Sequence, residues 1–194
     1  MSSARARISL TPAERRAIIA AAESTFLKLS NLYLEVLPIF QRYGFKPPSA
    51  GVVSRDTSEQ IEEQITLHCS TFSRGEGFAD LARYGERWEV KICKGRRLTI
   101  NQSARINGEN YIVVNYSSFS NLRRIWILWA ARDEFFTARK GNLNLRTVIV
   151  DAAQENAEVI HEVSTPPQAT SAAGLRMAKA SLSSAPGAAR KSRG

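Results

Sequence analysis

The sequence has few of the residues that form covalent cross-links or soft metal sites. Of its 194 residues, only two are cysteine and two are histidine. Cys69 and Cys93 lie far apart and neither belongs to a CxxC pair, which argues against a disulfide framework and against a structural zinc site. His68 has no second histidine or acid three or four residues later, so we expect it to be a core or boundary residue.

Long apolar runs are also missing. No stretch approaches the length of a membrane span, and no hydrophobic region follows the basic residues 2–7 to form a signal peptide. We therefore expect a soluble cytoplasmic protein with no membrane partner. Since 43% of the residues are hydrophobic, the chain is able to bury one good core, which predicts a single domain over residues 11–163 with a mobile basic arm at 1–10.

Acidic residues are absent from residues 164–194, which are rich in Ala, Ser, Pro and Gly and contain five basic residues. Such a segment cannot bury enough apolar area to fold, so we expect a disordered basic tail. The net charge of the whole chain is +9, and the 22 basic residues outside the tail exceed the 18 acidic residues by only four. The excess of positive charge favours a polyanionic partner such as DNA, although the tail supplies five of the nine excess charges.

A long helix is predicted over residues 11–43. Thr11 is a suitable N-cap, Pro12 suits the first helical position, and Glu14 is placed to complete a capping box. Pro38 should kink or end this helix near its last turn. An apolar stripe follows at three- and four-residue spacing: Ile19, Ala22, Phe26, Leu29, Tyr33, Val36 and Phe40. The stripe either packs on its own domain or forms, in part, the seam of a homodimer.

After a connecting loop at residues 44–54, a second helix is expected to start at Asp56 or Thr57. At 100° per residue, Glu62 stands at the edge of the apolar face of this helix, whereas Glu59 and Glu63 point away from it. Glu62 is therefore the acid that can reach a site beside the core. The alternative is that all three glutamates only keep the helix soluble.

After a turn region expected at residues 70–77, the most informative stretch is a predicted hairpin. Residues 78–82 and the alternating segment from Trp88 to Cys93 read as strands, joined by a two-residue turn at Tyr84-Gly85. That register places Asp80 opposite Glu89, where two carboxylates repel unless a divalent cation such as Mg²⁺ lies between them. Lys91 projects from the same face as Glu89. A three-residue loop would shift the register by one and separate the two acids.

Asp80, separated by eight residues from Glu89-Val90-Lys91, resembles the active-site signature of the PD-(D/E)XK nuclease superfamily, which has the restriction-endonuclease-like fold. The resemblance covers residues 57–150. It implies that Asp80 and Glu89 bind the metal and that Lys91 orients the attacking water, with Glu62 as a further metal ligand and Gln102 in a supporting catalytic role. The residue before the aspartate, often proline in the family, is Ala79 here.

Basic residues follow the hairpin and are candidates for phosphate binding: Lys94, Arg96, Arg97 and Arg105. They could equally belong to an ordinary solvated loop. We expect a short helix over residues 99–107, central strands at 111–116 and 125–131, and an edge strand at 146–150. The predicted fold is therefore α/β, with a mixed central sheet flanked by helices and a catalytic core over residues 56–150.

These expectations describe a Mg²⁺-dependent deoxyribonuclease in which Mn²⁺ is able to replace Mg²⁺. Two other classes of protein remain open at this point. One is a basic nucleic-acid-binding module that keeps the nuclease fold without chemistry. The other is an assembly protein whose long first helix is the functional surface.

Overall fold

The fold is described from a computed structural model of the chain. Residues 8–46, 50–77, 79–94, 97–101, 109–118, 121–131, 135–139, 142–149 and 156–163 are described, with side chains at all of these except 50–56, 101, 118, 121, 137–139 and 142–149. All of them belong to a compact unit that spans Met1–Val163, and a second unit spans Ser164–Gly194. Residues 1–7 of the predicted arm at 1–10 and the whole of the predicted tail lie outside the described residues.

Helix α1 spans Pro12–Arg42, close to the predicted bounds. The Thr11 hydroxyl accepts a hydrogen bond from the Glu14 amide, and the Glu14 carboxylate accepts one from the Thr11 amide, so the predicted capping box is present. Pro38 lies inside the helix, which continues for about one more turn before it ends. The helix is therefore stopped near Pro38 rather than at it.

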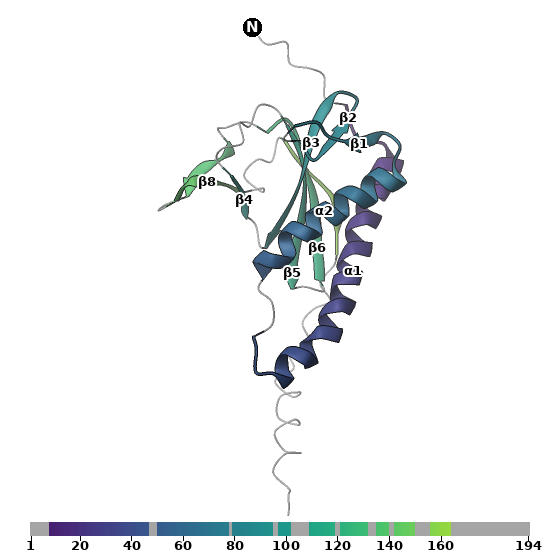
Figure 1. The fold of residues 1–194 in the computed structure, drawn as a ribbon. Coiled ribbons are helices and arrows are strands. Elements are labelled where there is room, and N and C mark those ends of the chain that lie inside the picture. Colours follow the sequence, from purple (N-terminus) through teal and green to yellow (C-terminus); the bar gives the residue numbers. More distant parts are fainter. Residues whose placement is uncertain are drawn as a thin grey trace, which may run out of the picture. The chain divides into compact units, whose positions relative to one another are not determined.

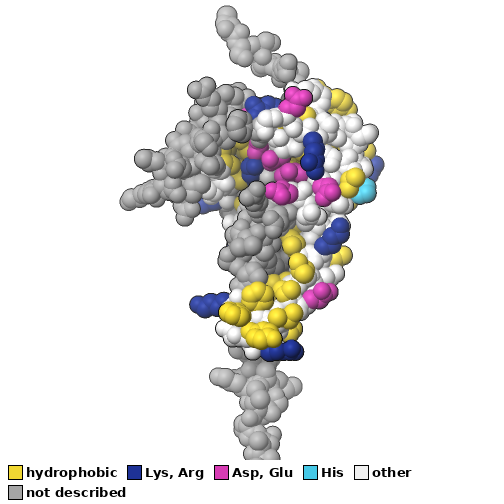
Figure 2. Space-filling view, viewed as in Figure 1, with side chains coloured by type: hydrophobic (Ala, Val, Ile, Leu, Met, Phe, Trp, Pro, Cys, Tyr) yellow, Lys and Arg dark blue, Asp and Glu magenta, His cyan; other side chains and the backbone are white. Residues whose placement is uncertain are grey.

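The two halves of α1 differ in what covers them. Ala22 and Phe26, in the first half, are buried in the core. In the second half, large apolar side chains lie at the surface: Leu27, Leu32, Leu34 and Ile39 are between 52% and 64% exposed. Figure 2 shows hydrophobic side chains gathered along this part of the molecule. Packing on the domain thus accounts for the first half of the predicted stripe only.

Helix α2 spans Ala50–His68 and begins six residues earlier than the predicted Asp56. The predicted loop at 44–54 therefore extends too far, because residues 50–54 belong to α2. Pro47 and Pro48 are the last strong helix breakers before this segment, and the helix starts soon after them. Ile61 and Ile65 are fully buried, so the predicted apolar face does turn toward the core. Among the described residues neither helix is long and apolar enough to cross a bilayer.

The main sheet has six strands in the order β1-β2-β3-β5-β6-β9. The strands are β1 (Phe72–Arg74), β2 (Leu81–Arg83), β3 (Glu86–Lys94), β5 (Asn110–Ser118), β6 (Asn121–Leu128) and β9 (Ala157–Glu162). Strands β3 and β5 are parallel, whereas the other neighbouring pairs are antiparallel. The prediction of a mixed α/β fold with a mixed sheet is therefore confirmed.

Several predicted boundaries were wrong. The expected turn at 70–77 contains β1, and β2 begins at Leu81 rather than at residue 78. Strand β6 begins at Asn121 and ends at Leu128, so the expected strand at 125–131 was displaced. Strand β9 was not predicted at all. Three-residue strands and an edge strand such as β9 carry too few apolar residues to give a clear alternation.

A second sheet has the order β4-β8-β7, with β4 at Arg97–Asn101, β8 at Asn142–Ile149 and β7 at Thr137–Arg139. Strand β4 contradicts the start of the predicted helix at 99–107. Leu98 and Ile100 are almost fully buried while Thr99 between them is exposed, which is the two-residue period of a strand. The predicted edge strand at 146–150 is the second half of β8, and it belongs to this second sheet.

Both faces of the main sheet are covered (Figure 1). Helices α1 and α2 lie against one face, where Trp88 and Val90 of β3 belong to the larger core. Trp88 is fully buried and meets Phe72 and Trp129 edge to face, at 5.5 and 5.2 Å between ring centroids. Strand β4 contributes Leu98 to a smaller core on the other face. Since side chains alternate, Glu89 and Lys91 project from the face opposite to Trp88.

A buried ion pair anchors the hairpin of β2 and β3 to the start of α1. The Arg83 guanidinium donates to both oxygens of Glu14 at 2.7 and 3.0 Å, and the exposed fractions of the two side chains are 0% and 1%. Arg83 also donates to the carbonyls of Ile8 and Ser9 and to Glu86, while the Thr71 hydroxyl donates to Glu14. Each nitrogen of the Arg83 guanidinium and each oxygen of the Glu14 carboxylate has a hydrogen-bond partner, which fixes the hairpin on α1.

Candidate metal and catalytic site

The hairpin has the register that the sequence predicted. Leu81 pairs with Trp88, Ala82 with Arg87 and Arg83 with Glu86. Tyr84 and Gly85 form the two-residue loop, and both have positive φ, 50° and 76°. Positive φ at both loop residues is the geometry that matches the twist of the flanking strands, and glycine adopts it without strain. The three-residue loop considered above is therefore excluded.

Asp80 lies one residue before β2 rather than within it. Its Oδ2 accepts a hydrogen bond from the backbone amide of Val90 at 2.9 Å, so the carboxylate lies against β3. Within β3, strand β2 pairs only with residues 86–88, which leaves the side of β3 beyond Trp88 open to Asp80. The carboxylates of Asp80 and Glu89 are thus brought to the same part of β3, as the register requires.

Gly75 helps to hold Asp80 in this place. The Gly75 amide donates to the Asp80 carbonyl at 3.2 Å. A Cβ atom on Gly75 would lie 2.3 Å from the Ala79 carbonyl oxygen, a distance that backbone atoms cannot tolerate. Any larger residue at position 75 would therefore push residues 79–80 away from β3.

Lys91 bridges the two acids. Its Nζ lies 2.6 Å from Glu89 Oε2 and 3.2 Å from Asp80 Oδ2. Burial lowers the pKa of a lysine, but here the charges of Glu89 and Asp80 outweigh it and raise the Lys91 pKa, so the ammonium form is stable. The Glu89 side chain is only 12% exposed. Burial and the neighbouring acids Asp80 and Glu109 raise its pKa in spite of Lys91.

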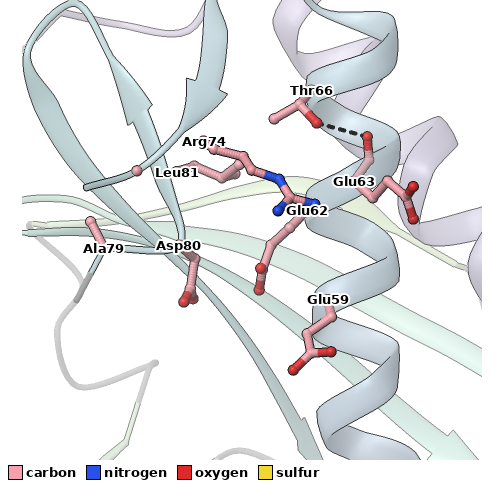
Figure 3. Close-up of a pocket in the computed structure, with 9 residues that line it drawn as sticks. Glu59, Glu62, Glu63, Thr66, Arg74, Ala79, Asp80 and Leu81 are labelled. Atoms are coloured by element: carbon pink, nitrogen blue, oxygen red, sulfur yellow. Dashed lines mark hydrogen bonds between the residues drawn. The ribbon is translucent and has the colours of Figure 1, made fainter. Parts of the chain in front are cut away.

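Glu62 of α2 belongs to the same electrostatic group. Burial, followed by the charge of Asp80, raises the pKa of Glu62 to about 7, although Lys91 acts in the opposite direction. In Figure 3, the Glu62 carboxylate extends toward Asp80, whereas the Glu63 carboxylate points outward from the helix. The acid selected from helix geometry is therefore the one that approaches Asp80.

Glu62 and Asp80 border a hollow of about 350 Å³ between α2 and the hairpin. Its walls consist of Glu59, Glu62, Glu63, Thr66, Arg74, Gly75, Ala79, Asp80 and Leu81 (Figure 3). Four carboxylates and one arginine make this hollow strongly acidic. Within the described part of the chain, no three His, Cys, Asp or Glu side chains are close enough to enclose a metal ion in their present positions. The ammonium group of Lys91 takes up the space beside Asp80 and Glu89.

Three elements supply the oxygen ligands that a hard cation would need: Glu62 from α2, Asp80 before β2 and Glu89 from β3. This donor set fits Mg²⁺, which binds one or two carboxylates and keeps several waters. The set does not fit zinc, which prefers sulfur and nitrogen ligands. Burial first, and the neighbouring acids second, raise the pKa values of Glu62 and Glu89, and a divalent cation would favour the charged form of both.

Of the predicted phosphate-binding residues, the two that the structure describes, Lys94 and Arg97, do not line this hollow. Lys94 is exposed at the end of β3, three residues beyond Lys91. Arg97 is exposed at the start of β4, in the second sheet. Gln102, Arg96 and Arg105 lie outside the described residues.

One basic residue at the hollow was not predicted. Arg74 ends β1, and its side chain extends toward α2 beside Glu62 (Figure 3). Sequence reasoning missed it because residues 70–77 were read as a turn. The only signal was the Phe-Ser-Arg alternation just before two glycines, which is too short to distinguish a strand from a loop.

No protein-family model matches the chain, and no curated protein matches it.

Proposed function

We propose that the protein is a metal-dependent endonuclease that hydrolyses DNA phosphodiester bonds, in the manner of the PD-(D/E)XK superfamily. The observation that carries the proposal is that Asp80 and Glu89 both contact Lys91, while Glu62, from a third element, lies within electrostatic range of all three. A fold selected for stability alone avoids gathering several carboxylates near a single ammonium group. Metal-dependent phosphodiester hydrolysis uses carboxylates in this way, as ligands of a cation.

The arrangement of the chain supports the same proposal. As in the resembled family, a helix precedes a hairpin that carries the aspartate and the Glu-x-Lys segment, and later strands extend a mixed sheet. Strand β5 continues the sheet parallel to β3, directly beside Glu89 and Lys91. Strand β4 is a departure, because a helix was expected between these two parallel strands.

In this proposal, Asp80, Glu89 and Glu62 hold Mg²⁺ or Mn²⁺. Such an ion would lower the pKa of a bound water and polarise the scissile phosphate. Lys91 would turn from the carboxylates toward that water, orient it, and offset the negative charge that develops on the phosphate oxygens. Gln102 would support the water, and Lys94 and Arg97 would contact DNA farther from the cut, with Arg96 and Arg105.

The direct test is cleavage of supercoiled plasmid with Mg²⁺ or Mn²⁺. We expect nicked or linear product that disappears on chelation. Because Lys91 acts on charge developed only in the transition state, Lys91→Ala should reduce the rate at least about 100-fold. Lys28→Ala, an exposed lysine on α1, is the matched control and should cleave normally. Equal cleavage rates for Lys91→Ala and the wild type would contradict the mechanism proposed for Lys91.

One observation favours a second function, a nucleic-acid-binding module without chemistry. Lys91 already neutralises both carboxylates at 2.6 and 3.2 Å, so the cluster is internally compensated in part. This alternative predicts DNA binding that falls steeply with salt, that neither chelator nor Asp80→Ala weakens, and no cleavage of any substrate.

We also propose that the second half of α1 pairs with a second copy of the chain. Leu29, Leu32, Val36, Ile39 and Tyr43 follow the three-four spacing of a helix–helix seam, and three of them are more than half exposed. A dimer would serve an enzyme that cuts two strands. Sedimentation should give a dimer for the wild type and a monomer for Leu32→Glu combined with Ile39→Glu. A monomeric wild type at high concentration would refute this pairing.

A further inference from the structure

Arg74 occupies a place shared by two hollows. The first is the acidic hollow described above. The second, of about 550 Å³, lies along the β1–β2 hairpin and is bordered by Arg74 and Arg87 together with Gly77, Gly85 and Glu86. A strand of DNA that left the acidic hollow along the hairpin would therefore pass Arg74 first and Arg87 next.

Arg74 is exposed, and within the described residues it makes no ion pair, although four carboxylates line the first hollow with it. The other cations of this region are engaged. Arg83 is buried against Glu14, Lys91 contacts Asp80 and Glu89, and Arg87 lies 3.4 Å from the buried carboxylate of Glu109. Among these cations, Arg74 is the one whose guanidinium is available to an incoming anion.

A polyanion that approaches Asp80 and Glu62 is repelled by both carboxylates until a cation meets it. Arginine suits this task, because its planar guanidinium binds two phosphate oxygens at once and stays charged at any working pH. Of the described basic residues at and after the end of β3, neither Lys94 nor Arg97 lines this hollow.

We propose that Arg74 binds a backbone phosphate of the substrate strand at the entrance to the acidic hollow. The inference rests on the proposed nuclease function and names the residue that brings the strand to it. Arg74 contacts the substrate rather than the attacking water, so it governs binding of DNA more than the chemical step.

The test compares Arg74→Gln and Arg74→Lys with Arg42→Gln, which removes an equally exposed charge at the far end of α1. Binding of a labelled DNA duplex with Mg²⁺ is measured at several salt concentrations in the Lys91→Ala background, so that no cleavage intervenes. We expect about tenfold weaker binding for Arg74→Gln, a salt dependence reduced by about one phosphate, and partial rescue by lysine. In the cleaving protein, KM should rise with little change in kcat.

The outcomes separate the two proposals. If the wild type cleaves DNA and Arg74→Gln binds and cleaves as Arg42→Gln does, the role of Arg74 is wrong while the nuclease proposal stands. If Arg74→Gln changes Mg²⁺ affinity but not the salt dependence of DNA binding, Arg74 only compensates the acids, and the inference is again overturned. If the wild type neither binds nor cleaves DNA, both proposals fail.

Discussion

The hairpin of β2 and β3 carries two charged clusters that differ in almost every electrostatic respect. In the first cluster, the Arg83 guanidinium donates hydrogen bonds to both oxygens of the Glu14 carboxylate, to two backbone carbonyls and to Glu86. Around Lys91, one ammonium faces Asp80 and Glu89 directly and Glu62 at longer range. The Arg83–Glu14 pair is one to one and closed to water, whereas Asp80 and Glu62 of the second cluster open onto a hollow.

The pKa values of the acids follow this difference in opposite directions. Burial alone would raise the pKa of Glu14, yet hydrogen bonds from Arg83, Thr11 and Thr71 hold it at about 2. Burial and Asp80 instead raise the pKa of Glu62 to about 7. A lowered pKa means that the charged acid stabilises the fold, and a raised pKa means that it destabilises the fold. The comparison therefore separates an acid whose charge stabilises the fold, Glu14, from one whose charge does not, Glu62.

The largest expected effect on stability is at the first cluster. Glu14→Gln removes the buried counter-charge of the Arg83 guanidinium and leaves only the more exposed Glu86 beside it, which should lower the free energy of unfolding by about 3–5 kcal/mol. Asp80→Asn is the matched change at the other cluster, and it should alter stability by less than about 1 kcal/mol because the side chain is 25% exposed and near other acids. Urea denaturation at pH 7 measures both. Equal losses of unfolding free energy in Glu14→Gln and Asp80→Asn would contradict the distinction between the two clusters.

Stability should also depend on pH through Glu14. Because its pKa is lowered from 4.5 to about 2, its contribution is complete above pH 4.5 and is lost as the pH falls toward 2. Thermal melting from pH 6 to pH 2.5 should show the wild type losing this part of its stability, while Glu14→Gln lacks that component from the start. Parallel curves for the two proteins would contradict the role of the buried pair.

A smaller effect of opposite sign is expected at Glu62. Its pKa is raised from 4.5 to about 7, so stability is lost as the pH rises through that interval, when the unfolded chain releases a proton that the folded chain retains. Without metal, Glu62→Gln should therefore be more stable than the wild type by about 1 kcal/mol at pH 8, after allowance for screening by water, and equal to it at pH 4. Glu63→Gln, which removes an outward-pointing acid, should show no such gain.

Much of this architecture could be predicted from local pattern. The capping box of Thr11 and Glu14 and the Tyr84-Gly85 turn are short-range signals, and the register of the hairpin follows from the turn. The register in turn places Asp80 beside Glu89. Helical periodicity likewise selects Glu62 among three glutamates.

The rest depended on tertiary contacts that local pattern does not encode. Glu14 was recognised as a capping residue, but nothing near it in the sequence indicates that Arg83, 69 residues later, is its buried partner. The sequence predicts helix from residue 99, within β4, because it does not show that Leu98 and Ile100 belong to a buried cluster with Tyr111 and Val113. Arg74 and strand β1 were missed for a related reason, since three residues carry no periodicity.

The most direct test of the central claim is a calorimetric titration of the protein with Mg²⁺ at pH 8. We expect saturable binding to the wild type, binding weakened at least about tenfold in Glu89→Gln, and unchanged binding in Glu63→Gln. The weakening follows because Glu89 supplies one of the few carboxylate ligands available to the ion. Absence of saturable binding to the wild type, or identical titrations for Glu89→Gln and the wild type, would contradict the assignment of this cluster to a metal.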